Sequence, residues 1–106
     1  MLLVQNGRHL DELLSQPLLV LLKHSVTCSV SAYAYRKVQS YFKKSPKTPV
    51  YVIPVQSRAE QSRLIEERTG VRHESPQLLV FRHGVVTAVA SHHAITTQFL
   101  ADQFEL

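Results

Sequence analysis

Cys28 is the residue of this sequence best suited to covalent chemistry, and it is the only cysteine among 106 residues. A buried apolar run at 18–22 comes before it, and a segment with apolar residues at helical spacing follows, which predicts a strand-to-helix junction at Cys28. A thiol at the start of a helix faces free backbone N–H groups and the positive end of the helix dipole. Because both stabilise the nucleophilic thiolate, the position predicts thiol chemistry.

The plain alternative is that a lone cysteine is a small buried hydrophobe. Two further features argue against it. Ser31 lies one helical turn after Cys28, where its hydroxyl can hydrogen-bond a thiolate. Ser75 and Pro76 come directly before a predicted hairpin, where a cis peptide bond would turn Ser75 toward Cys28 and leave its N–H and C=O free for a substrate. We therefore expect a thiol site built from two separated segments.

The elements that must position these residues begin with the strand at 18–22. Its apolar run is continuous, as in a strand buried on both faces of a parallel sheet, so helices should cover both sides. The helix after Cys28 has an apolar face that includes Val30, Ala34 and Val38. A second strand is predicted at 50–55, where Pro54 cannot donate a ladder hydrogen bond and so indicates an edge position or the last rungs of the strand.

The flanking segments have their own boundary signals. A short strand at 2–5 precedes a helix that Asn6 can cap, with its apolar face formed by Leu10, Leu13 and Leu14. Ser57 and Glu60 have the spacing of a capping box, which predicts the start of a third helix that Gly70 ends.

The C-terminal third contains two short apolar runs, 78–81 and 85–89, separated by three residues that include Gly84. So short a connection allows only an antiparallel hairpin, and Gly84 can supply the positive φ of its turn. A last helix, 95–104, should bury Phe99, Leu100 and Phe104.

These elements predict one α/β domain over residues 1–106. Strands 18–22 and 50–55 must be parallel, with a right-handed crossover through the helix between them. The hairpin adds two antiparallel strands, which gives a mixed central sheet with helices on both faces. A strand, a turn that carries cysteine and then a helix is the active-site arrangement of thioredoxin-like proteins. In that fold the proline before the hairpin is cis and packs against the cysteine, so we expect a cis Ser75-Pro76 bond.

The chain also resembles a known family, the monothiol bacilliredoxins, thioredoxin-like proteins of the bacillithiol system that are also called the YtxJ family. Two motifs and their order carry the resemblance, Lys23-His24-Ser25-x-Thr27-Cys28-x-x-Ser31 and Arg72-His73-Glu74-Ser75-Pro76-Gln77. It covers almost the whole chain, including the Ser91-His92 segment before the last helix. Ser29 departs from the family, which commonly has a rigid proline directly after the cysteine.

The resemblance implies a thiol-disulfide oxidoreductase that removes bacillithiol, a thiol built from cysteine, glucosamine and malate, from protein mixed disulfides. Cys28 would be the attacking thiolate, and Thr27 and Ser31 would support it. Ser75 and Pro76 would bind the extended substrate.

Lys23 or a nearby arginine would pair with the malate carboxylates of bacillithiol. The implied partners are bacillithiolated client proteins, together with bacillithiol or a disulfide reductase that resolves the adduct on Cys28. No bound cofactor is implied, because bacillithiol is the thiol substrate.

The histidines support weaker hypotheses. His24 and His73 flank the predicted site and could lower the thiol pKa if protonated, although structural roles are at least as well supported. The pair His92-His93 invites a metal interpretation, but adjacent side chains diverge and spacing places no third ligand, so we expect no metal site.

Composition sets the remaining limits. The net charge is +4 and the pI is about 9.5, but the basic residues are spread out, and the densest group is Lys43, Lys44 and Lys47. This indicates a mild preference for anionic partners and not a nucleic-acid-binding protein. No apolar run is long enough to cross a membrane, and the first residues do not resemble a secretory signal. With a single cysteine, these features favour the reducing cytoplasm.

Two other classes of function stay open at this point. The domain could be a non-catalytic binding or adaptor module in which Cys28 is a modification site. It could instead be a glutaredoxin-like protein that uses another thiol or holds an iron–sulfur cluster between two subunits.

Overall fold

Five strands form one mixed sheet in the computed structural model, which describes residues 1–105. Their order across the sheet is β1-β3-β2-β4-β5. The strands are β1 Leu2–Leu3, β2 Leu18–His24, β3 Val50–Pro54, β4 Gln77–Arg82 and β5 Val85–Ser91. β3 runs parallel to β1 and β2, whereas β4 is antiparallel to β2 and to β5. The predicted parallel pair with a C-terminal antiparallel hairpin is confirmed.

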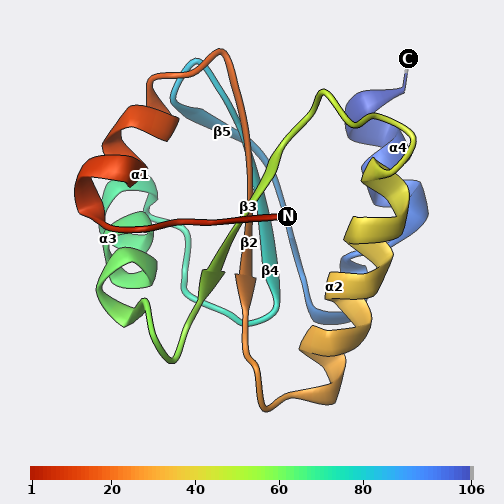
Figure 1. Ribbon diagram of the computed structural model, residues 1–106, viewed down its shortest axis with the longest axis horizontal. Coiled ribbons are helices and arrows are strands. Elements are labelled where there is room, and N and C mark those ends of the chain that lie inside the picture. Colours follow the sequence, from red (N-terminus) through yellow and green to blue (C-terminus); the bar gives the residue numbers. More distant parts are fainter. Residues whose placement is uncertain (106) are drawn as a thin grey trace.

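Helices cover both faces of the sheet, as the continuous apolar run of β2 requires. They are α1 Gly7–Leu14, α2 Ser29–Phe42, α3 Ala59–Thr69 and α4 Thr97–Phe104, with a short 3-10 turn, η1 His92–Ala94, before α4. α1 and α3 lie on one face of the sheet and α2 and α4 on the other (Figure 1). The α/β class and the thioredoxin-like arrangement of layers are therefore confirmed.

β2 is the central strand and divides the core into two apolar clusters. Leu19 and Leu21 belong to the cluster with residues of α1 and α3, and Val20 and Leu22 belong to the cluster with residues of α2 and α4. Successive side chains of a strand point to opposite faces. Every residue from 19 to 22 is therefore almost fully buried, on one side or the other.

Pro54 lies where its missing N–H is tolerated. It is the last residue of β3 and pairs with His24 at the final rung of β2. β1 reaches only Tyr51 and Val52 on the other side of β3, so Pro54 faces no partner strand there. The prediction of a terminal rung on a strand next to the sheet edge is confirmed.

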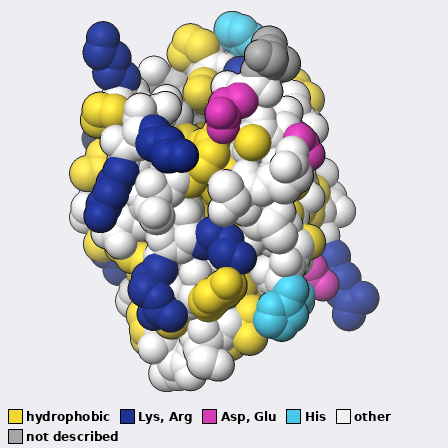
Figure 2. Space-filling view, turned by 90° about the vertical axis from the view of Figure 1, so that its right-hand side faces the viewer, with side chains coloured by type: hydrophobic (Ala, Val, Ile, Leu, Met, Phe, Trp, Pro, Cys, Tyr) yellow, Lys and Arg dark blue, Asp and Glu magenta, His cyan; other side chains and the backbone are white. Residues whose placement is uncertain are grey.

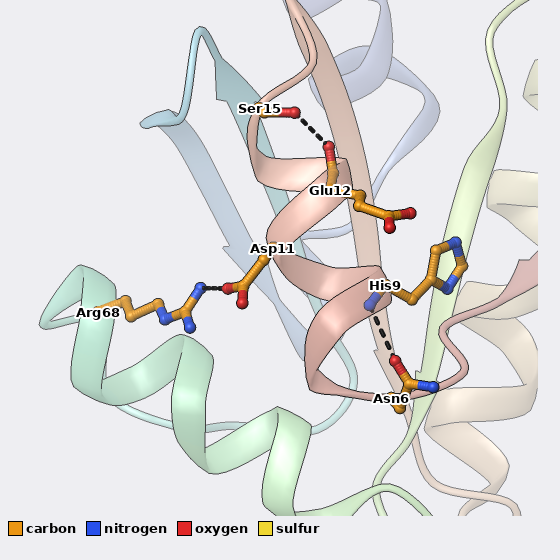
Figure 3. A network of polar contacts seen from close by, with 6 residues as sticks. All are labelled: Asn6, His9, Asp11, Glu12, Ser15 and Arg68. Carbon is orange, nitrogen blue, oxygen red and sulfur yellow. Dashed lines mark hydrogen bonds and ion pairs between the residues drawn. The ribbon is translucent and has the colours of Figure 1, made fainter.

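The start of α1 agrees with the sequence. Asn6 is the N-cap, and its Oδ1 accepts a hydrogen bond of 2.9 Å from the backbone N–H of His9 (Figure 3). An ion pair between Asp11 and Arg68 joins α1 to α3 on the same face of the sheet (Figure 3). The strand predicted at 2–5 is shorter, because only Leu2 and Leu3 pair with β3.

The capping box predicted at Ser57 is wrong. The N-cap of α3 is Arg58, one residue later, and no side chain caps this helix end. The backbone N–H of Arg58 donates to the carbonyl of Pro54 at 2.8 Å, and its Nε donates to the carbonyl of Val4 at 3.0 Å. These contacts set the chain path into α3. The other end agrees with the sequence, since Gly70 closes the helix with φ of 71°.

The predicted hairpin is present, and His83 and Gly84 form its turn with φ of 52° and 78°. A Cβ on Gly84 would lie 3.1 Å from the carbonyl oxygen of Leu14, so the close approach of α1 also favours glycine there. The last helix begins later than expected, with Thr96 as its N-cap, and Leu100 is its fully buried residue.

Candidate active site

Cys28 is the N-cap residue of α2, at the junction that the sequence predicts. Its backbone is extended, and its carbonyl accepts the first helical hydrogen bond, from Ala32 at 3.0 Å. The thiol is free and partly exposed. A disulfide of another molecule can therefore reach the sulfur at the surface end of the helix.

The local environment favours the thiolate. The backbone N–H groups of Ser31 and Val30 lower the pKa of the Cys28 thiol, the Ser31 hydroxyl adds a smaller effect, and desolvation partly opposes them. Ser31 is fully buried, and its Oγ also accepts a hydrogen bond of 3.2 Å from the backbone N–H of Ser25. The Ser31 hydroxyl therefore links the turn before Cys28 to the first turn of α2.

The turn before Cys28 is held by Gln56, a residue that the sequence analysis missed. Gln56 follows β3, and its Nε2 donates to Ser25 Oγ at 2.8 Å and to Thr27 Oγ1 at 3.3 Å. Its Oε1 accepts a hydrogen bond of 3.2 Å from the backbone N–H of Val26. One amide thus contacts three successive residues, which we call the Gln56 clamp. Thr27, predicted to support the thiolate, has its hydroxyl on this clamp and on Ser25.

The Ser75-Pro76 peptide bond is cis, as the sequence analysis expects. β4 begins at Gln77, which pairs with Lys23 near the end of β2. This register places the cis bond at the end of the sheet where β2 finishes and the Cys28 turn begins. The carbonyl of Pro76 accepts a hydrogen bond of 2.9 Å from the backbone N–H of His92, so η1 also lies at this end of the sheet.

Lys23 does not occupy the position that its predicted role requires. Its side chain is fully buried on the α3 side of the sheet, and its Nζ lies 3.2 Å from Nδ1 of His73. Burial lowers the pKa of Lys23, and the charge of Glu66 partly offsets this effect. An ammonium group enclosed in this way cannot contact the carboxylates of a ligand at the surface. We therefore correct the substrate-binding assignment of Lys23 to a structural one.

The two candidate histidines lie on opposite faces of the sheet. His24 faces α2, with its ring centroid 4.9 Å from that of Tyr35, and His73 contacts Ser62 of α3 at 3.1 Å. Burial lowers the pKa of His24, and burial followed by the charge of Lys23 lowers the pKa of His73. Both rings therefore favour the neutral form, which removes the reason to expect a cationic histidine beside the thiol.

Within residues 1–105, no group of three or more His, Cys, Asp or Glu side chains is arranged to hold a metal ion. No helix in the same range is long and apolar enough to span a membrane.

Solved structures with the same architecture are numerous. A protein described provisionally as an oxidoreductase with a thioredoxin fold is 28% identical, with a TM-score of 0.91, over 98% of this chain and 93% of that one. Thioredoxin from Fasciola hepatica is 15% identical, with a TM-score of 0.78, over 97% and 95% of the two chains. Thioredoxin from Plasmodium falciparum is 14% identical, with a TM-score of 0.77, over 98% and 99%. The fold is that of thioredoxin.

This fold, with a free and partly exposed thiol at the start of α2, is that of a thiol-disulfide oxidoreductase of the thioredoxin class. The particular family follows from the sequence. Residues 4–100 match the family of monothiol bacilliredoxin BrxC, and the chain belongs to that family.

Proposed function

We propose that this protein removes bacillithiol from mixed disulfides on client proteins and that Cys28 is the attacking nucleophile. The observation that carries the proposal is the position of Cys28, a partly exposed thiol at a helix N-terminus whose pKa is lowered by the N–H groups of Ser31 and Val30. Membership of the monothiol bacilliredoxin family directs the choice of bacillithiol as the thiol substrate.

The reaction is a thiol-disulfide exchange in which no net electrons are gained or lost. The Cys28 thiolate attacks the bacillithiol sulfur of the mixed disulfide, and the client sulfur leaves as a thiolate. Bacillithiol is then joined to Cys28. Since the sequence has no second cysteine, a free bacillithiol or a partner reductase must attack this adduct and regenerate the Cys28 thiolate.

The surrounding residues have distinct proposed roles. The Ser31 hydroxyl and N–H stabilise the thiolate. The backbone groups of Ser75, which lies just before β4, pair with the extended client segment. Thr27 stabilises the turn before Cys28 through the contacts of its hydroxyl with Ser25 and Gln56. The reaction needs no bound cofactor, and we propose the reducing cytoplasm as the compartment, because free thiols persist there.

The adaptor interpretation is less well supported, because an adaptor has no need of a thiol whose pKa is lowered. In the glutaredoxin-like interpretation, Cys28 would exchange disulfides with another small thiol in place of bacillithiol. In the iron–sulfur interpretation, it would be a ligand of a cluster between two subunits. Separate experiments can therefore distinguish the three functions.

The test uses a single-cysteine client protein joined to bacillithiol. Intact-mass spectrometry should show bacillithiol transferred to Cys28 and an equal amount of reduced client, and Cys28→Ser should abolish both changes. Parallel incubations with glutathione disulfide, and with iron and sulfide, should give no comparable adduct or cluster. A client that stays bacillithiolated, or retained transfer by Cys28→Ser, would contradict the proposal.

A further inference from the structure

A groove with a volume of about 330 Å³ lies along the exposed side of α2, beside the start of α4. The residues that line it include Tyr33, Arg36, Lys37, Ser40, Lys44 and Thr97. Tyr33 is 55% exposed, and the ammonium of Lys37 lies 4.3 Å from its ring centroid. An exposed aromatic ring beside cations is a common feature of recognition surfaces.

The charges of this groove have few internal partners. No ion pair within residues 1–105 involves Arg36, Lys37 or Lys44. Moreover, the sequence has no Asp or Glu between Leu13 and Ala59, a stretch that contains all of α2. The carboxylate of Glu105 reaches the groove, because it accepts a hydrogen bond from the hydroxyl of lining residue Tyr41.

Figure 2 shows the face formed by α2 and α4. Most of the Lys and Arg side chains on this face lie in its left and central parts, with others at the lower right margin, and Asp and Glu side chains lie in its upper central part and along its right side. The cations Arg36 and Lys37 of α2, together with Lys44 two residues after its end, therefore give this side of the helix a local positive charge.

The groove is aligned with the thiol. Tyr33, Lys37 and Ser40 recur at helical spacing on one side of α2, and the same stripe extended toward the N-terminus reaches Ser29, directly after Cys28. At 1.5 Å per residue, positions 33–40 lie roughly 8–18 Å from Cys28 along the helix axis. At about 3.3 Å per residue, a peptide with its cysteine at Cys28 would place residues about four positions away over Arg36 and Lys37, and residues about seven positions away over Lys44.

We propose that the α2 groove is a docking surface for an acidic segment of the protein that exchanges its disulfide with Cys28. The occupant is a protein and not a nucleic acid, because the groove lies on the helix that begins at the exchanging thiol and its lining offers only three cations, Arg36, Lys37 and Lys44. The inference rests on the proposed function, since Cys28 must be the exchanging thiol. Charge complementarity would raise the rate at which acidic partners meet the thiol, and the effect would weaken with added salt.

The experiment compares two peptides of equal length, each with one cysteine joined to bacillithiol. One peptide has Asp and Glu around the cysteine, and the other has Lys at the same positions. The measured quantity is the rate at which bacillithiol appears on Cys28, divided by the rate with the neutral 2-hydroxyethyl disulfide. Measurements at low and high salt separate steering by charge from the exchange chemistry.

The test variant is Arg36→Gln with Lys44→Gln, and the matched control is Arg8→Gln with Lys47→Gln. Each pair removes two exposed positive charges, but the control pair lies outside the groove. The original protein should prefer the acidic peptide, and the test variant should reduce this preference about threefold to tenfold at low salt, which is a modest effect for electrostatic steering because only two charges are removed. The control pair should retain the preference.

Several results would overturn the proposal. One is an original protein with no preference between the peptides, and another is a preference that survives in the test variant. If the test variant lost as much rate with bacillithiol disulfide as with the acidic peptide, Arg36 and Lys44 would bind bacillithiol itself and not the peptide. Binding of a 20-base-pair DNA through Arg36 and Lys44, without peptide preference, would identify a nucleic acid as the occupant. Absence of any adduct on Cys28 with either peptide would instead contradict the proposed function.

Discussion

The reactivity of Cys28 depends on a few atoms in the first turn of α2. Because the N–H groups of Ser31 and Val30 lower its thiol pKa, alkylation of Cys28 by iodoacetamide should reach its midpoint at a lower pH than alkylation of a cysteine in an unfolded peptide. Ser31→Ala should raise the midpoint, since the hydroxyl contributes, but only partway, since the N–H groups remain. Ser29→Ala is the matched control on the exposed side of the helix and should leave the midpoint unchanged.

The same pKa shift has a consequence for stability. A thiol whose pKa is lower in the folded state stabilises the fold above its unfolded-state pKa, and this contribution is lost as the pH falls through the folded-state pKa. The difference in unfolding free energy between the original protein and Cys28→Ser should therefore grow as the pH rises through this window. Urea titrations at several pH values measure it, and a difference that does not vary with pH would contradict the thiolate assignment.

Residue 31 also allows a test of the monothiol reaction. Ser31→Cys places a second thiol one turn from Cys28, at the Cys-x-x-Cys spacing in which thioredoxin-fold proteins form an internal disulfide. The bacillithiol adduct on Cys28 should then be short-lived, because the introduced thiol can attack it and release bacillithiol. Mass spectrometry over time would follow the adduct. An equally long-lived adduct in this variant would show that position 31 does not reach the sulfur.

At the scale of elements, the turn between β2 and α2 depends on the Gln56 clamp. Gln56→Ala removes three hydrogen bonds to Ser25, Val26 and Thr27. Exposed hydrogen bonds contribute little to stability compared with buried ones, so we expect the unfolding free energy to fall by about 1 kcal/mol in total. Gln39→Ala, an exposed glutamine on α2, is the matched control.

A purely structural role for Gln56 would alter stability alone. A positioning role would also slow bacillithiol transfer to Cys28 and speed amide hydrogen exchange at Val26, because the turn would sample more conformations. Gln56→Glu keeps the acceptor for Val26 but loses the donor to Ser25 and Thr27. In Gln56→Glu, the Val26 amide should therefore keep its protection against hydrogen exchange, while the rate of bacillithiol transfer to Cys28 stays low. Transfer at the original rate in both variants would contradict the positioning role.

At the scale of the whole molecule, the buried Lys23 joins β2 to the segment after α3. Its contact with His73 ties two parts of the chain that are 50 residues apart. Lys23→Met keeps the length of the side chain and removes the buried charge, so stability should be unchanged or higher. The pKa of His73 should rise, since the charge of Lys23 helps to lower it. Nuclear magnetic resonance titration of the histidines measures this shift, with the exposed Lys47→Met as control.

The sign of the pH effect follows from the neutral form of His73. Because its pKa is lower in the folded state, the original protein should lose stability as the pH falls below the ordinary histidine value of about 6.5. Lys23→Met should lose less over the same window. If the two proteins respond equally to pH, the charge of Lys23 does not act on His73. Transfer of bacillithiol should persist in this variant, because Lys23 is buried and not a ligand-binding residue.

The sequence by itself determined the features that depend on local chemistry. The continuous apolar run of β2 specifies a strand buried on both faces, and the cysteine after it marks the start of α2. Gly70 and Gly84 mark backbone positions with positive φ, which glycine adopts without steric cost. Asn6 caps α1 through a side chain three residues from its partner. Each feature needs only neighbouring residues, so it is visible in the order of amino acids.

Tertiary structure decided the features that depend on distant partners. The Gln56 clamp joins residues about 30 positions apart, and nothing near Gln56 in the sequence marks its partners. Lys23 is expected to be an exposed cation because lysine is rarely buried, yet its place on the central strand encloses it. Ser57 has the spacing of a capping box, but the helix begins one residue later, at Arg58, whose side chain donates to the carbonyl of Val4, 54 residues away in the sequence. Each of these features depends on a residue far away in the sequence, so the neighbouring residues alone do not indicate it.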